Sequence, residues 1–267
     1  MKLNGLLILI AGIILAGCAS TRRGENNNGI LLSEKDQKQL LSKTTPPQQY
    51  GFRVFMTPQG LDFFGAARLH PNHKTKENFI GNRLPIIKMR GRAARMNTAA
   101  LIDPSLPASW MELTTAQEFD AKFLGFKDEV FAYRGGYNLD GADAFAAVVS
   151  QLRFDQLFME NVPVFVRMAK HSLGALARDV TSPNIGAVIG YDILSTFEFV
   201  QIDLKAQVVR FSASTPYTPN KELLMTKTRI LNLPNFGLTV DGAIFDQSIP
   251  IILDIAGDYH FARSDVT

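Results

Sequence analysis

Short apolar runs alternate with polar segments along most of this chain, and the alternation has the two-residue period of β-strands. Residues 50–56 and 61–67 form two such segments, separated by a turn that contains proline and glycine. A short helix is expected near residues 115–124, whereas the polar residues 70–82 predict an exposed loop. The pattern therefore predicts an all-β fold with a few short helices.

Two aspartates, Asp103 and Asp254, end apolar runs in matching frames. Each lies twelve residues after a glycine, Gly91 in the first case and Gly242 in the second. Each frame predicts a strand, a turn at the glycine, a second strand and a carboxylate at the strand's end. A duplicated unit of this kind can bring two carboxylates face to face, where they share a proton and activate water. The simpler alternative is that each aspartate is a turn residue or a helix N-cap.

A third segment, residues 187–203, reads Ala-Val-Ile-Gly-Tyr-Asp-Ile-Leu-Ser-Thr-Phe-Glu-Phe-Val-Gln-Ile-Asp. With Asp103 and its upstream hairpin, it resembles the retropepsin-like aspartic peptidase family. In that family an apolar-apolar-Gly strand precedes a short helix with a leucine four residues after the glycine, and Gly190 and Leu194 have this spacing. The resemblance implies a closed barrel lobe over residues 50–214 and a partial second copy at the C-terminus, over residues 232–267.

The resemblance also implies roles for particular residues. Asp103 and Asp254 would be the catalytic pair, one ionised as the general base and the other protonated to polarise the scissile carbonyl. Gly190 would lie in a buried strand beside the Asp103 loop, with a helix starting near Asp192. Residues 134–138 would occupy the position of the family's flap hairpin.

Both aspartate segments depart from the Asp-Thr-Gly motif of the family. The first reads Asp-Pro-Ser from Asp103, and the second reads Asp-Ile-Ala-Gly from Asp254. Neither keeps the threonine that links the two loops, Pro104 lacks a backbone N–H, and Ser105 carries a side chain where the family has glycine. We therefore expect a catalytically impaired relative that binds extended peptide or protein segments, or that serves as an envelope scaffold. The alternative is an active endopeptidase that uses Asp103 and Asp254, or Asp103 from both chains of a homodimer.

The N-terminus has the pattern of an export signal. Lys2 precedes an apolar run over residues 6–15, which is too short to span a bilayer comfortably. Leu-Ala-Gly-Cys then ends at Cys18, which is the only cysteine of the chain and so cannot form an intrachain disulfide. This tetrapeptide resembles a bacterial lipoprotein cleavage box. The alternative is an uncleaved N-terminal anchor.

The lipoprotein resemblance implies a processed and anchored protein. Residues 1–17 would be the signal peptide, Cys18 would carry the lipid, and residues 18–49 would be a tether. The membrane would then be a partner through the N-terminal lipid. Ala19 implies sorting to the outer membrane of a two-membrane cell envelope, with the folded part facing the periplasm.

Composition and the remaining motifs give no support for nucleic-acid, phosphate or metal binding. The 28 basic and 25 acidic side chains give a net charge of +3, which offers no argument for nucleic acid as a partner. The basic run over residues 88–95 is interpreted as a solvated face rather than a phosphate site. His70 and His73 lack the additional ligands of a metal centre. We expect no cofactor and no metal.

Overall fold

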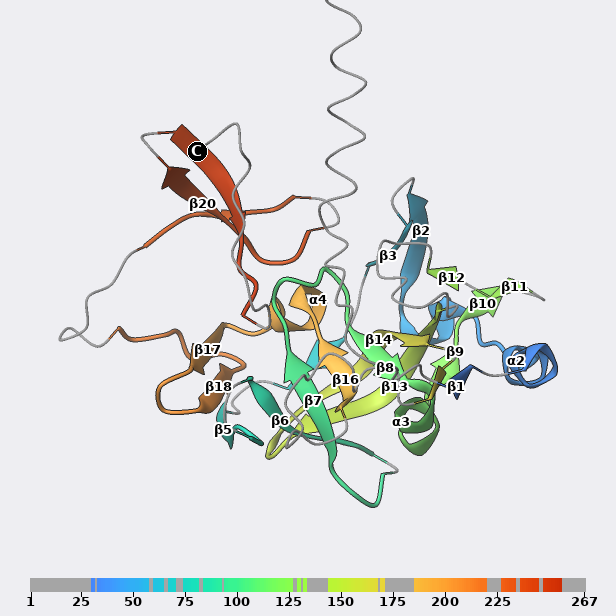
Figure 1. The fold of residues 1–267 in the computed structure, drawn as a ribbon. Coiled ribbons are helices and arrows are strands. Elements are labelled where there is room, and N and C mark those ends of the chain that lie inside the picture. The colour runs from blue at the N-terminus through green and yellow to red at the C-terminus, as the bar shows by residue number, and fades with distance from the viewer. Residues whose placement is uncertain are drawn as a thin grey trace, which may run out of the picture.

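Figure 1 shows the computed structural model of the chain. It describes residues 30–31, 33–57, 60–64, 67–70, 74–81, 84–92, 94–126, 129–130, 132–133, 144–167, 169–170, 185–219, 227–233, 236–244 and 247–255. The expected signal peptide, Cys18 and the expected flap at residues 134–138 lie outside these residues. Among the helices described, none has both the length and the apolar character needed to cross a bilayer.

Six strands form a closed barrel: β6 (Ile86–Gly91), β7 (Thr98–Ile102), β8 (Trp110–Glu112), β13 (Ala144–Phe154), β14 (Leu157–Arg167) and β16 (Ile185–Ile189). The cycle runs β13–β6–β7–β16–β8–β14, and β14 pairs again with β13. The β7–β16 and β8–β14 pairs are parallel, and the other four are antiparallel. The structure thus confirms the predicted all-β class with a closed barrel.

Apolar side chains cover both faces of the barrel strands. Ile87 and Ile102 belong to one large core cluster, while their chain neighbours Ile86 and Leu101 belong to a second cluster on the other face. β16 is buried at every position and β7 at all but its first. Parallel strands with both faces covered have this near-continuous apolar character. The central β7–β16 pair is therefore a rigid base for the residues that follow it.

A second sheet, made of β17 (Phe199–Asp203), β18 (Val208–Ser212) and β5 (Lys74–Asn78), lies beside the barrel (Figure 1). The β17–β18 hairpin follows the short helix that comes after Gly190. The prediction of an exposed loop over residues 70–82 is wrong, because β5 pairs with all five residues of β18.

A third sheet contains the second aspartate frame and consists of β19 (Ile230–Leu231), β20 (Thr239–Ile244) and β21 (Gln247–Ile252). The β6–β7 and β20–β21 pairs confirm that each aspartate follows an antiparallel hairpin. The predicted turn at the glycine is wrong in both units. Gly91 is the last residue of β6, and Gly242 lies within β20, where it pairs with Ile249 of β21.

The other elements are short and lie around these sheets. The helices are α2 (Glu34–Leu41), α3 (Leu113–Glu118), α4 (Tyr191–Leu194) and the 3-10 helix η1 (Pro47–Tyr50). The remaining strands are β1 (Ile30–Leu31), β2 (Arg53–Thr57), β3 (Gly60–Phe64), β4 (Arg68–Leu69), β9 (Lys122–Phe123), β10 (Gly125–Phe126), β11 (Glu129–Val130), β12 (Ala132–Tyr133) and β15 (Ala169–Lys170).

Candidate functional site

Asp103 lies directly after β7, at the end of the buried parallel pair. Its backbone N–H donates to the carbonyl of Ile189, the last residue of β16, over 3.0 Å. Only 5% of the residue is exposed. Residues 99–102 are buried on both faces, so a one-residue register shift would put each side chain into a space that is packed for its neighbour. The position of Asp103 is therefore fixed by the barrel.

Ser105 holds the carboxylate of Asp103. Its backbone N–H and its hydroxyl both donate to Oδ1 of Asp103, over 3.0 Å and 2.6 Å. Hydrogen bonds from donors two residues further along are typical of an aspartate-stabilised turn. Although Ser105 carries a side chain where the family has glycine, its N–H still approaches the carboxylate. The hydroxyl adds a donor that glycine lacks.

Gly190 lies against the loop that follows Asp103. A Cβ atom at this position would be 2.6 Å from the carbonyl oxygen of Ala108 and 2.9 Å from that of Leu106. The N–H of Tyr191 donates to the same Leu106 carbonyl over 2.8 Å. The structure confirms the prediction that Gly190 is buried beside the Asp103 loop, because only a residue without Cβ permits this approach.

Ser109 and Asp192 connect the same loop to α4. Ser109 donates its hydroxyl to Oδ1 of Asp192 over 2.6 Å and its N–H to Oδ2 over 3.0 Å. The Ser109 hydroxyl accepts a bond from the Gly190 N–H over 2.9 Å, and the N–H of Ile193 donates to Oδ1 of Asp192 over 2.8 Å. Burial raises the pKa of the Asp192 carboxyl to about 6, although the hydrogen bonds that Ser109 and Ile193 donate to it lower the pKa.

Gly237 and Leu238, which lead into β20, contact the Asp103 loop. The N–H of Leu238 donates to the Pro104 carbonyl over 2.6 Å, and the Leu238 carbonyl accepts a bond from the N–H of Leu253 over 3.0 Å. A Cβ atom on Gly237 would collide with the backbone of Pro104 and Ser105. Pro104, which has no N–H to donate, thus links the two aspartate segments through its carbonyl oxygen.

Asp254 follows Leu253 directly, so the structure brings the second aspartate segment to the same junction. The settings of the two residues differ, because Asp103 is buried and Asp254 is exposed. The residues before Asp254 are also open to solvent, since Ile251, Ile252 and Leu253 are 37%, 38% and 37% exposed. The two segments meet through the backbone of Leu238, and their carboxylates lie in unlike surroundings.

In the part of the chain that the structure describes, no group of three or more histidine, cysteine, aspartate or glutamate side chains is arranged as a set of metal ligands. His70 lies with Nε2 3.4 Å from Oε2 of Glu160, and its ring centroid is 4.1 Å from that of Phe158. His73 lies outside the described residues.

Sequence reasoning located Gly190 but missed Ser109 and Asp192 as a pair. The available signal was an aspartate at the start of a short helix, two residues after the glycine, but its partner is 83 residues away. Local patterns do not specify such a contact. It depends on the antiparallel pairing of β8 with β16, in which Trp110 lies opposite Val188 and the preceding Ser109 comes next to the end of β16.

Comparison with solved structures gives distant structural similarity, and comparison with protein families and curated proteins gives no match. Among solved structures, the chain is similar to the crystal structure of a retropepsin-like aspartic protease from Rickettsia conorii, with 13% sequence identity and a TM-score of 0.32. The match covers 55% of this chain and 91% of that one.

Proposed function

We propose that this chain is a non-cleaving relative of the aspartic peptidases that binds an extended peptide segment beside the Asp103 loop. The unlike settings of Asp103 and Asp254 carry this proposal. Two aspartates that share one proton must both lie in a single desolvated site. Here Asp103 is 5% exposed and held by Ser105, whereas Asp254 is exposed.

Exposed apolar side chains near the junction support peptide binding. Phe236 and Leu253 are 41% and 37% exposed. Phe236 lies two residues before Leu238, and Leu253 donates its N–H to the Leu238 carbonyl. Pro250 interrupts the outer edge of β21, because proline has no N–H to donate to an added strand. Apolar peptide side chains, rather than pairing along β21, would therefore supply most of the binding energy.

The test incubates the purified chain from residue 19 onward with a denatured protein and a mixed peptide library between pH 3 and pH 7. We expect mass spectrometry to find no new peptide termini. We expect cross-linking to recover bound peptides rich in apolar residues, and Phe236→Ala to reduce that recovery. Met96→Ala is the matched control, because Met96 is a 77% exposed apolar residue of the β6–β7 connection.

Cleavage that disappears in Asp103→Asn would contradict a non-cleaving role. If Asp254→Asn also abolished it, the active endopeptidase with an intrachain pair would be correct. If only Asp103→Asn did so, a homodimer that contributes Asp103 from both chains would be the better account. Recovery of peptides that both alanine variants reduce equally would contradict a binding surface at Phe236.

We also propose that the chain is a lipoprotein of the cell envelope, anchored through Cys18 in the outer membrane and facing the periplasm. The Leu-Ala-Gly-Cys box after a short apolar run supports this assignment. Cys18→Ser should abolish labelling by a fatty acid and leave a precursor that keeps residues 1–17. A variant that still carries the label at mature size would contradict the assignment.

A further inference from the structure

Two arginines face each other across neighbouring barrel strands. Arg90 in β6 pairs directly with Arg153 in β13, and both are exposed. Side chains at directly opposed positions share one face of a sheet and are close enough to interact, so like charges there are destabilising. In the described part of the chain, neither guanidinium forms an ion pair with a carboxylate. No carboxylate in that part of the chain therefore neutralises either charge through an ion pair.

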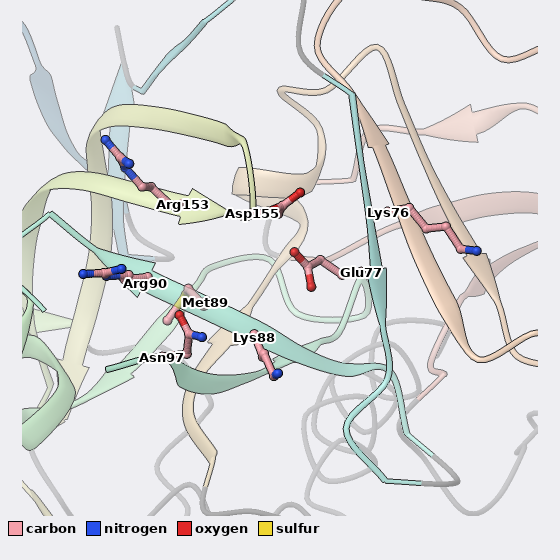
Figure 2. A pocket seen from close by; sticks show the side chains of 8 residues that line it. All are labelled: Lys76, Glu77, Lys88, Met89, Arg90, Asn97, Arg153 and Asp155. Atoms are coloured by element: carbon pink, nitrogen blue, oxygen red, sulfur yellow. The ribbon is translucent and has the colours of Figure 1, made fainter. Parts of the chain in front are cut away.

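Both guanidinium groups are anchored through the nitrogen nearest the backbone. Nε of Arg90 donates to the Ala94 carbonyl over 2.9 Å, and Nε of Arg153 donates to Oε1 of Gln151 over 2.8 Å. The Arg153 guanidinium also lies 5.4 Å from the ring centroid of Phe158. Figure 2 shows the two side chains extending toward the same side. Neither of these anchoring bonds uses the terminal nitrogens of the two arginines.

The two arginines line a cavity of about 330 Å³ together with Lys88 and Asn97. Its acidic residues, Glu77 and Asp155, lie next to each other and away from the arginine heads (Figure 2). Burial and then the Asp155 charge raise the pKa of Glu77, while Lys88 acts in the opposite direction. Glu77 thus interacts with both Asp155 and Lys88. The arginine side of the cavity remains positively charged.

We propose that Arg90 and Arg153 bind the phosphate group of a ligand, carried either by a soluble molecule or by a lipid headgroup. A guanidinium offers paired N–H donors that match two oxygens of a phosphate, and charge-assisted bonds of this kind are strong. Two fixed guanidiniums can hold one doubly charged group between them. A bound phosphate would also relieve the repulsion across the β6–β13 pair.

This site is separate from the Asp103 loop, because the lining of the cavity comes from β5, β6, the β6–β7 connection and the β13–β14 hairpin. A general excess of positive charge does not explain it, since the net charge of the chain is only +3. The basic run over residues 88–95 thus contains one residue, Arg90, that the fold pairs with a distant arginine.

The experiment titrates the full chain with inorganic phosphate and with pyrophosphate by calorimetry. A parallel assay measures binding to phosphatidylcholine vesicles with and without phosphatidic acid. We expect saturable binding in at least one assay, weakened about tenfold or more in Arg90→Gln and in Arg153→Gln, since each variant loses charged hydrogen bonds. Arg95→Gln is the matched control. It removes an exposed arginine of the same basic run that is absent from the cavity lining.

Binding of the free anions that depends on both arginines would support a soluble phosphorylated ligand. Binding only to vesicles with phosphatidic acid, with the same dependence, would support a lipid headgroup. Absence of binding in both assays would overturn the proposal. Equal weakening in Arg95→Gln would also overturn it, because the attraction would then be non-specific. Circular dichroism of each variant ensures that the comparison is made between folded proteins.

Discussion

The Asp103 and Asp254 units begin alike and end in different surroundings. Each is an antiparallel hairpin followed by an aspartate. The first hairpin is built into the closed barrel, where β16 and β8 extend the sheet beyond β7. The second belongs to a three-stranded sheet in which β21 is an edge strand. The same local unit thus gives one buried aspartate and one exposed aspartate.

The difference shows that later strands, rather than the hairpin itself, create the setting of an aspartate. Asp103 gains its backbone bond from Ile189, and the Asp103 loop gains its clamp from Ser109 and Asp192. In the C-terminal sheet, Ile230 and Ile251 flank Val240 in one cross-strand row and are 53% and 37% exposed. Val240 in the middle of that row is buried, but its two apolar neighbours lack the covering that the barrel gives to β7.

Adding the same methyl group to the glycine of each unit should separate the two settings most strongly. In Gly91→Ala the new Cβ would lie 2.5 Å from Cγ of Phe119, which is fully buried. Overpacking of this kind typically costs about 1–3 kcal/mol, and we expect the upper end. In Gly242→Ala the new atom meets the flexible end of the exposed Ile251 side chain, so we expect a cost below about 0.5 kcal/mol.

Urea denaturation of both variants and the parent measures the two free energies of unfolding. The variants are controls for each other, because each exchanges a strand glycine for alanine. Equal losses in the free energy of unfolding would contradict the difference between the two units, since they would mean that the C-terminal sheet is packed as tightly as the barrel.

The clamp on the Asp103 loop should respond to pH through Asp192. Burial raises the pKa of this carboxyl from 3.8 to about 6. The folded protein therefore binds a proton more tightly than the unfolded chain does, and the stability from that proton is present below about pH 4. It is lost as the pH rises through about 6. Each pH unit between these limits should change the free energy of unfolding by up to about 1.4 kcal/mol.

The measurement compares the parent with Asp192→Asn between pH 4 and pH 7. Subtracting the two curves removes the titration of all other groups, provided that they are unaffected. We expect the parent to lose stability relative to the variant as the pH rises across this window. A difference that is independent of pH would show that the Asp192 carboxylate is not desolvated.

Strand periodicity predicted the hairpins and the all-β class, because alternation is visible along the chain. The buried position of Gly190 was expected from the resemblance to the retropepsin-like family, which rests on the glycine before a short helix. The strand β5 was missed since its Lys-Thr-Lys-Glu-Asn sequence is polar, and only Thr75 is buried against the rest of the molecule. Pairing with β18, rather than propensity, makes this segment a strand.

The finer parts of the site could not be read from local pattern. The twelve-residue spacing from glycine to aspartate is the same in both units, yet Gly91 ends its strand and Gly242 lies within one. The role of Ser105 depends on a turn geometry that a Pro-Ser sequence does not specify. The junction at Leu238 joins residues that are 134 positions apart in the numbering, from Pro104 to Leu238.

The smallest expected effect comes from removing each negative charge in turn. Asp103→Asn keeps an oxygen that can accept the two Ser105 bonds but loses their charge-assisted character, so we expect a cost of about 1 kcal/mol in the free energy of unfolding. Asp254→Asn alters an exposed residue and should cost less than about 0.5 kcal/mol.

Urea denaturation of both single variants and the double variant at pH 7 tests whether the two aspartates act independently. If the two effects add, the carboxylates act independently and the unlike settings stand. A coupling energy above about 0.5 kcal/mol would mean that the two aspartates interact across the Leu238 junction, which would favour the active peptidase.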